Sequence, residues 1–527
     1  MTVNSLTFLA FFGVLALVYY LVRPRFQWMV LLAASIFFAA SSGARVLLYL
    51  CYTSVTTFFA VRWMGGIDEA FSKSLAENGK AWSPAEKKAQ KEQNKKKKRH
   101  VLVALLVLNI GALALTKYSG FLLENLNLVL GFVGLGAVPV LRLAAPLGIS
   151  YYTLQSMGYA LDVYKGKVKP EKNFAKTFLF VGFFPQMTQG PIGRFKDLAV
   201  QLYDKHPFCY ENLAQGCRLL LWGFFKKCVI ADRMNPMVSQ VFDNYQGYGG
   251  MTLFLGCIYM SIQAYADFSA YMDIVSGFSR ILGIRLAENF HRPFFSKSLA
   301  EYWRRWHITL SSWFRDYLFY PLSISKPAVK FGRFGKAVFG VRIGKLFPAV
   351  FALFIVWFST GLWHDASWRY ILWGVANGVV IIGAMILEPQ FTWMKKKLHV
   401  REESGPWQVF CMVRTFLIVS FLKVFPGPAD TAGTLGVIKG ILTDFRPEFS
   451  YAALFPGIEK GDLLFVLFGL VLFFCVSLVQ ERKPERATFA GRNVVVRWGC
   501  YFVLLAGILC MGAFEISMVG GFAYAQY

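Results

Sequence analysis

The sequence predicts an all-α polytopic membrane protein with roughly 10–13 membrane helices. Hydrophobic residues make up 56% of the 527 residues, and the mean hydropathy is +0.45. These residues fall in blocks long enough to cross a hydrocarbon core. The net charge of +26 comes largely from Lys and Arg that flank the blocks, as the positive-inside rule describes. Anionic membrane lipid is therefore a better expected partner than nucleic acid.

The first three predicted spans are residues 6–22, 26–40 and 46–63. Arg23 and Arg25 separate the first two, and a Lys-rich polar loop, residues 65–100, follows the third. If all three cross, both basic segments lie on one side, which predicts an outside N-terminus and a cytosolic loop. We expect that loop to be solvated, partly helical or disordered, and in contact with anionic lipid. Segment 6–22 lacks a basic leader and a small-residue cleavage site, so we interpret it as a retained span.

Further spans are predicted along the rest of the chain, which we interpret as a single multi-pass domain, residues 1–527. Several are short or interrupted by Pro or Gly, which predicts tilted, re-entrant or interfacial helices. The nine cysteines form no CxxC pair and no metal-binding spacing. The further predicted spans are residues 101–116, 126–140, 147–163, 213–229, 251–278, 346–358, 371–387, 408–425, 463–479 and 498–514.

The segment FFPQMTQGPIGRF, residues 183–195, cannot form a continuous helix because it holds two prolines and two glycines. Irregular backbone at membrane depth persists only inside protein or beside a water-filled cavity. Gln186 and Gln189 are suited to satisfy freed backbone groups or to line a tunnel. A plain interfacial loop is an equally good interpretation of the spacing.

A second polar segment, residues 265–280, carries Asp267, Ser269 and Asp273 in an apolar context. The two carboxylates are six residues apart and do not share a helical face, which argues against a paired acid/base site. Polar helix-to-helix bonding or a cap is the favoured interpretation, and a polar lining or a histidine orienter is the alternative.

Residues 298–317 read as an amphipathic helix that opens with the capping-box spacing of Ser298 and Glu301. Trp306 and His307 fall at helical spacing on one face, together with several large apolar residues. This pattern is typical of a helix in the membrane interface or packed beneath the bundle. The spacing favours an anchor with His307 at its polar rim over a His307 that enters a central funnel with His364.

His364 ends a long apolar run and faces a second one, residues 370–387. An ionisable group in such a water-poor region is usually functional, and imidazole can accept and return a proton near neutral pH. Asp365 either orients the ring or caps a turn. A hydrogen-bonded structural role is the competing interpretation for this histidine.

Taken together, the motifs resemble the membrane-bound O-acyltransferase family, in the branch of alginate O-acetyltransferases and teichoic-acid D-alanine transferases. The resemblance rests on residues 183–195, DFSAYMDI (267–274), NFHRPFFSKSLAEYWRRWHITLSSWFRDYLFYPL (289–322) and TGLWHDASWRYILWGVANG (360–378). It implies that His364 is the catalytic histidine at the narrow centre of a tunnel and that His307 is the second histidine. Family members commonly carry Gly at the position of Asp365 and His at that of Asn377. Residues expected to line the tunnel or orient the substrate are Asp365, Asn377, Gln186, Trp306 and Trp363.

The resemblance also implies the reaction. A cytosolic thioester, most simply acetyl-CoA, donates an acyl group that reaches an extracytoplasmic polysaccharide hydroxyl or an acyl-accepting partner protein, with His364 as the base and no bound cofactor. The expected location is the bacterial cytoplasmic membrane. Two alternatives stay open: a D-alanine transferase served by an acyl-carrier protein, and a non-catalytic polytopic transporter or flippase.

Overall fold

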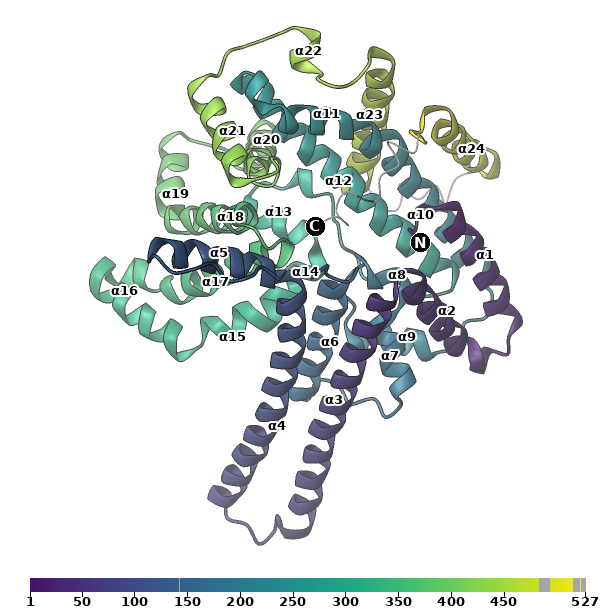
Figure 1. The fold of residues 1–527 in the computed structure, drawn as a ribbon, viewed down its shortest axis with the longest axis vertical. Coiled ribbons are helices and arrows are strands. Elements are labelled where there is room, and N and C mark those ends of the chain that lie inside the picture. Colours follow the sequence, from purple (N-terminus) through teal and green to yellow (C-terminus); the bar gives the residue numbers. More distant parts are fainter. Residues whose placement is uncertain (142, 483–492, 515–521, 523–527) are drawn as a thin grey trace. The chain divides into compact units, whose positions relative to one another are not determined.

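The computed structural model describes residues 1–141, 143–482, 493–514 and 522. These residues form helices joined by loops, and their only strand-like feature is an isolated antiparallel bridge between Phe290 and Trp306 (Figure 1). The predicted all-α class is confirmed. The chain divides into two compact units, Met1–Gly216 with Phe278–Ala287, and Cys217–Gly277 with Glu288–Tyr527.

The first unit has an aromatic core around Phe8. The ring centroid of Phe8 lies 5.0 Å from that of Phe278 and 5.9 Å from that of Phe38, and all three side chains are buried. The helices of this unit are α1 (Leu6–Leu21), η1 (Pro24–Phe26), α2 (Gln27–Ser41), α3 (Ala44–Asn78), α4 (Pro84–Leu113), η2 (Ala114–Tyr118), α5 (Ser119–Phe132), α6 (Ile149–Tyr164), α7 (Phe174–Gly182), α8 (Phe184–Met187), α9 (Phe195–Tyr203) and the start of α10 (Tyr210–Phe225).

The Lys-rich segment 65–100 is a helical hairpin, in which α3 and α4 are joined by a short turn. A capping box of Ser83 and Glu86 fixes where α4 begins in this highly charged sequence. The ammonium of Lys98 lies 2.6 Å from the Asp68 carboxylate and ties the two helices together. With 35 and 30 residues the helices are about 52 and 45 Å long, so both exceed a ~30 Å hydrocarbon core. Figure 1 shows them side by side, extending past α6.

The irregular segment around Gln186 is buried inside the first unit, so the plain interfacial loop is the wrong interpretation. The side-chain amide of Gln186 donates to the Pro191 carbonyl at 2.6 Å. The Gly193 amide donates to the side chain of Gln155 at 3.0 Å. Glutamine side chains thus satisfy backbone groups that proline and glycine free from helical bonding.

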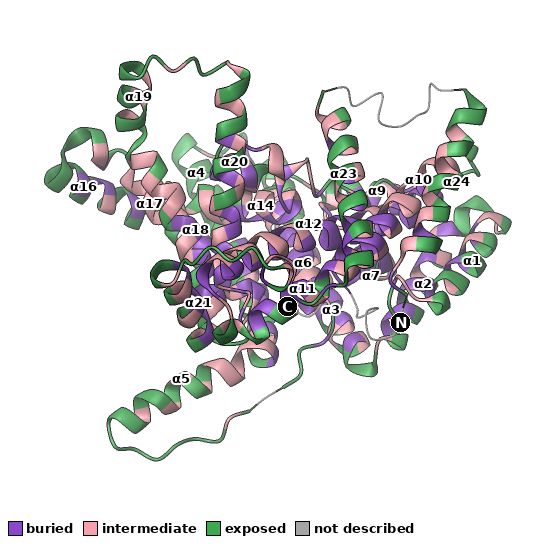
Figure 2. Cartoon of the chain, turned by 90° about the horizontal axis from the view of Figure 1, so that it is seen from above, coloured by how far each residue is buried: buried purple, intermediate pink, exposed green. Residues whose placement is uncertain are grey.

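The second unit contains a long buried helix, α12 (Gly250–Ile281), whose last turn is counted in the first unit. Figure 2 shows α12 mostly buried, whereas α16 and α24 are largely exposed. The other helices of this unit are the end of α10, η3 (Lys226–Ala231), α11 (Asp232–Asp243), η4 (Tyr245–Gly247), η5 (Pro293–Phe295), α13 (Leu299–Arg305), α14 (Ile308–Phe314), η6 (Arg315–Phe319), α15 (Tyr320–Ser323), α16 (Lys326–Gly344), α17 (Phe347–His364), α18 (Trp368–Ile386), α19 (Glu388–Lys397), α20 (Gly405–Phe421), η7 (Leu422–Val424), α21 (Thr431–Thr443), α22 (Tyr451–Leu454), α23 (Lys460–Arg482) and α24 (Val494–Met511).

Within the described ranges, eight helical segments are long and apolar enough to cross a membrane, and α1 is a shorter apolar helix. Large apolar side chains are exposed on these segments, as for Phe502 (63%) and Val503 (70%) on α24, which is the pattern of a surface that faces lipid. The chain is therefore a multi-pass membrane protein. The eight segments are Pro24–Ser41, Ala44–Asn78, Pro84–Phe132, Phe347–His364, Trp368–Ile386, Gly405–Val424, Lys460–Arg482 and Val494–Met511.

Candidate active site

The helices α17 and α18 approach closely because glycines line their contact. A Cβ on Gly361 would lie 2.3 Å from the Tyr370 carbonyl oxygen, and one on Gly374 would lie 2.3 Å from the Trp357 carbonyl oxygen. Small residues allow this approach of two backbones inside a membrane. The contact fixes the end of α17, where His364 lies, against the first turns of α18.

Replacing Gly374 by alanine is expected to lower the stability of the protein by about 1–3 kcal/mol, because the added methyl group would overlap a backbone carbonyl that cannot move independently. Gly383→Ala is the matched control, since it lies on the same helix and a Cβ there meets nothing within 4 Å. Thermal unfolding in detergent measures the difference. Equal melting temperatures for the two variants would show that the glycine contact does not hold α17 against α18.

His364 is the last residue of α17, and its side chain is surrounded by aromatic rings. The imidazole centroid lies 5.0 Å from Trp363, 5.1 Å from Trp373 and 6.1 Å from Tyr370, whose ring is nearly parallel to it. His364 as a residue is 8% exposed. The carboxylate of Asp365, which caps α17, lies 3.9 Å from the guanidinium of Arg369, so its role in orienting the histidine stays a prediction.

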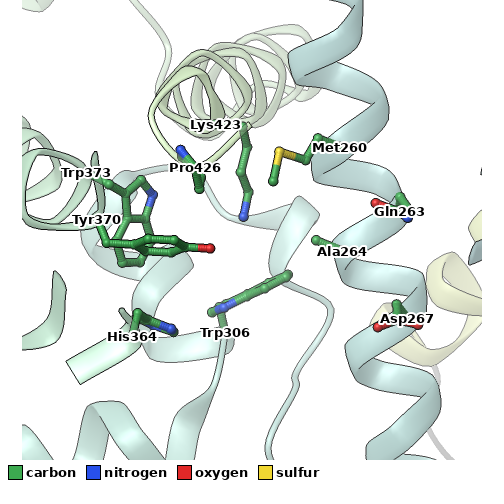
Figure 3. A pocket seen from close by; sticks show the side chains of 10 residues that line it. All are labelled: Met260, Gln263, Ala264, Asp267, Trp306, His364, Tyr370, Trp373, Lys423 and Pro426. Atoms are coloured by element: carbon green, nitrogen blue, oxygen red, sulfur yellow. The ribbon is translucent and has the colours of Figure 1, made fainter. Parts of the chain in front are cut away.

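The His364 imidazole lines a cavity of about 50 Å³ within the second unit (Figure 3). Its walls come from α12, the end of α17, the start of α18, η7 with the turn that follows it, and the residue after α13. Such a volume holds about three to five water-sized groups. The lining residues are Met260, Gln263, Ala264, Asp267, Trp306, His364, Tyr370, Trp373, Lys423 and Pro426.

The helix predicted over residues 298–317 is wrong at His307, where the chain leaves α13 before α14 begins. His307 has a φ of 47°, in the left-handed region. The chain turns there because it pairs with an earlier segment: the Ile308 amide donates to the Asn289 carbonyl at 3.0 Å, and Phe290 bridges Trp306. The Asn289 side-chain oxygen also accepts from the Thr309 amide and hydroxyl.

The imidazole of His307 is buried at 1% exposure, so its interpretation as the polar rim of an anchor is wrong. Nδ1 lies 3.2 Å from the Asn289 side-chain oxygen, which accepts and thereby selects the neutral tautomer with a proton on Nδ1. The Trp363 indole lies 6.2 Å from this ring and 5.0 Å from that of His364, so both histidines contact one tryptophan. Trp306, rather than His307, lines the cavity.

Acidification is expected to destabilise the protein through His307. Burial lowers the pKa of His307 from 6.5 to about 3. Between these two pH values His307 binds a proton in the unfolded chain but stays neutral in the folded protein. The free energy of unfolding is therefore highest above the pKa of His307 in the unfolded chain and decreases as the pH falls toward 3. The decrease is about 2 kcal/mol at pH 5. The melting temperature should decrease more between about pH 7.5 and about pH 5 in the wild type than in His307→Gln. An equal fall in both would contradict the assignment.

Asn377 supports the aromatic wall of the cavity. Its side-chain oxygen accepts from the Trp303 indole at 3.2 Å, and its amide donates to the Trp373 carbonyl at 2.8 Å. The Trp303 ring in turn lies 5.6 Å from that of Trp373. Gln186 belongs to the first unit, where it bonds to its own loop, and its place in a tunnel stays a prediction.

A buried ionic network beside the cavity, and Lys423 on the wall of the cavity, were not predicted from the sequence. The Lys227 ammonium lies 2.8 Å from both Asp232 and Asp267, and the Lys226 ammonium lies 2.8 Å from Asp273. Polar bonding between helices, the favoured interpretation for the α12 carboxylates, is confirmed, although Asp267 also lines the cavity. The overlooked signal was lysine at the edge of apolar segments, where an ionisable group is rare.

Comparison with known proteins identifies the family. Residues 171–335 match the model of the membrane-bound O-acyltransferase family. Over 397 residues the chain is 31% identical to the probable alginate O-acetylase of Pseudomonas syringae pv. tomato, a match that covers 75% of this chain and 70% of that protein. The chain belongs to the membrane-bound O-acyltransferase family. The resemblance inferred from its motifs is confirmed.

Two further relatives of this acyltransferase-family chain define its branch. It is 32% identical over 301 residues to the probable alginate O-acetylase of Azotobacter vinelandii, across 57% of this chain and 54% of that protein. It is 26% identical over 359 residues to the teichoic acid D-alanyltransferase of Bacillus subtilis, across 62% of this chain and 86% of that protein. The match thus spans about half the length of the Azotobacter relative.

Proposed function

We propose that this chain is an O-acyltransferase that moves an acetyl group from a cytosolic thioester, most simply acetyl-CoA, toward a polysaccharide hydroxyl outside the membrane. The observation that carries the proposal is the His364 imidazole on the wall of a cavity, rather than sealed in an apolar cluster or turned toward lipid. Family membership supports the reaction class, since acyl transfer to oxygen is the chemistry that the family name describes.

In the proposed mechanism, the neutral His364 imidazole accepts the proton of the attacking hydroxyl and returns it to the leaving thiolate. A hydroxyl is a weak nucleophile until a base removes its proton, and the low dielectric of the cavity strengthens each bond to the developing charge. His307, buried and neutral, positions the His364 ring through Trp363, whose indole packs against both imidazoles.

Two properties of the cavity favour acetyl over D-alanyl. Its volume of about 50 Å³ suits the three heavy atoms of an acetyl group. Lys423 on the wall would repel the ammonium of a D-alanyl group. The teichoic acid D-alanyltransferase relative makes D-alanyl transfer from an acyl-carrier protein the second candidate.

We place the protein in the bacterial cytoplasmic membrane, with its N-terminus outside and the α3–α4 hairpin in the cytosol. Lysines concentrate on that hairpin, as the positive-inside rule requires of a cytosolic segment. The thioester then enters from the cytosolic side, and the acetyl group leaves toward the polysaccharide directly or through an acyl-accepting partner protein.

The test is transfer of radiolabel from acetyl-CoA by membranes that contain the protein, with membranes lacking it as the control. Alginate and a whole-cell envelope fraction serve as acceptors. Label that appears as base-labile ester only with the protein present supports the proposal. Transfer from a D-alanyl carrier-protein thioester but not from acetyl-CoA would establish the second candidate, and solute transport without any ester formation would overturn both.

A further inference from the structure

We propose that Lys423 is a second catalytic residue, whose ammonium binds the carbonyl oxygen of the acyl group and stabilises the oxyanion formed on attack. This inference rests on the proposed acyl transfer and adds a group that neither the family model nor the sequence motifs single out. The family-model match ends at residue 335, well before Lys423.

Lys423 lies in a place where a lysine is energetically unfavourable unless it has a function. It belongs to η7, at the end of the apolar segment Gly405–Val424, and its side chain lines the cavity. A charged side chain in a membrane helix costs several kcal/mol when it lies deep, and such residues usually face a cavity or a substrate path. The side chain of Lys423 faces such a cavity.

The neighbours of Lys423 leave its charge available to a ligand. The ammonium lies 5.6 Å from the ring centroid of Trp306, and within the described part of the chain no carboxylate lies within 4 Å of it. Lys226 and Lys227, also buried, each have carboxylates at 2.8 Å. Contact with an indole face holds a cation in place but does not occupy its N–H donors.

Figure 3 shows the Lys423 ammonium, the Tyr370 hydroxyl and the His364 ring directed toward the same space. Lys423 enters this space from η7, and His364 enters it from the end of α17 on the other side. A carbonyl group held between them would present its carbon to a hydroxyl near His364 and its oxygen to the ammonium. That is the arrangement of a base and an oxyanion donor around one reacting centre.

The hydroxyl oxygen of the acceptor bonds to the carbonyl carbon while His364 takes the hydroxyl proton, and the carbonyl electron pair becomes an oxyanion beside the Lys423 ammonium. The carbonyl then re-forms, the carbon–sulfur bond breaks, and the imidazolium returns its proton to the thiolate. Lys423 keeps all its protons and contributes only charge and hydrogen bonds.

The size of the cavity assigns Lys423 to the carbonyl oxygen rather than to an anionic group of a sugar. A space of about 50 Å³ accepts an acetyl group but not a sugar ring with its carboxylate. The oxyanion is the negative charge that the reaction itself creates on the acyl group inside the cavity. A cation at that position stabilises the transition state more than the bound substrate, which is the requirement for a faster chemical step.

The experiment compares purified wild type with Lys423→Met, Lys423→Arg and Lys423→Gln in acetyl transfer from acetyl-CoA. Lys423→Met keeps the length of the side chain and removes the charge, so kcat should fall by about 10²–10³-fold while the KM for acetyl-CoA stays near the wild-type value. Lys423→Arg should recover part of the lost rate. The matched control is Lys396→Met, an exposed lysine on α19, which should leave kcat unchanged.

Melting temperatures measured on the same samples separate catalysis from folding. If Lys423→Met unfolds, the neutral donor variant Lys423→Gln carries the comparison and should still be slower than Lys423→Arg. Wild-type kcat in Lys423→Met or Lys423→Gln, or a change confined to the KM of the acceptor, would overturn the assignment. An inactive wild type would instead refute the proposed acyl transfer, so the two failures are distinguishable.

Discussion

Replacing His364 by alanine is expected to lower kcat/KM for acetyl transfer by about 10²–10⁴-fold, the usual contribution of a general base. The imidazole is the cavity-lining side chain best suited to take a proton near neutral pH, since the nearby Asp267 is paired with Lys227. The measurement is ester formation from labelled acetyl-CoA by purified protein at saturating acceptor.

Two variants separate the loss of the base from a loss of packing. His364→Gln keeps most of the volume against Trp363 and Trp373 but cannot accept and return the proton, so it should be as slow as His364→Ala. His399→Ala, at an exposed histidine of the same unit, should retain wild-type activity. An active His364→Ala would exclude this imidazole as the base and leave the cavity without its proposed chemistry.

The sequence predicted the scaffold of the site well because hydropathy reports length and polarity directly. Segments 346–358 and 371–387 were expected as spans, and apart from one residue at the end of each they lie in α17 and α18. The position of His364 at the end of the first span followed from the same pattern. The close approach through Gly361 and Gly374 did not, since glycine in a membrane helix marks either a packing contact or nothing.

The backbone at His307 could not be predicted from local spacing. Residues 298–317 keep helical periodicity across the break, and the chain turns there because it pairs with the segment that begins at Asn289. A contact between segments 18 residues apart is tertiary information, and it overrides helical propensity here. The burial of His307 follows from the same turn.

The lysine partners of the α12 carboxylates could not be predicted from the sequence pattern either. Asp267 and Asp273 were recognised as polar residues in an apolar helix, but their lysines lie 40 or more residues earlier, on the π-helical segment η3. Lys423 carried a signal that could have been read in the sequence, because it stands within an apolar segment of 20 residues. The network around Lys227 has the larger consequence for stability.

Replacing Lys227 by methionine is expected to destabilise the protein by about 3–5 kcal/mol. Its ammonium lies 2.8 Å from each of Asp232 and Asp267, whose side chains are 7% and 2% exposed. Removing the lysine leaves two carboxylates close together in a poorly solvated region without their shared cation. Thermal and denaturant unfolding in detergent measures the loss, and activity should fall as well because Asp267 lines the cavity.

The cause of the stability loss in Lys227→Met can be tested directly. Most of the lost stability should return when the carboxylates of Asp232 and Asp267, left without their lysine, are also removed. Lys227→Met combined with Asp232→Asn and Asp267→Asn takes away the whole network and should regain most of the melting temperature, since a well-packed neutral cluster is often as stable as a buried ion pair. Lys226→Met is the matched single variant. Its partner Asp273 is 26% exposed and can be hydrated, so the smaller loss is expected there. Equal losses at Lys226 and Lys227, or no recovery in the triple variant, would mean that side-chain packing rather than buried charge holds η3 against α12.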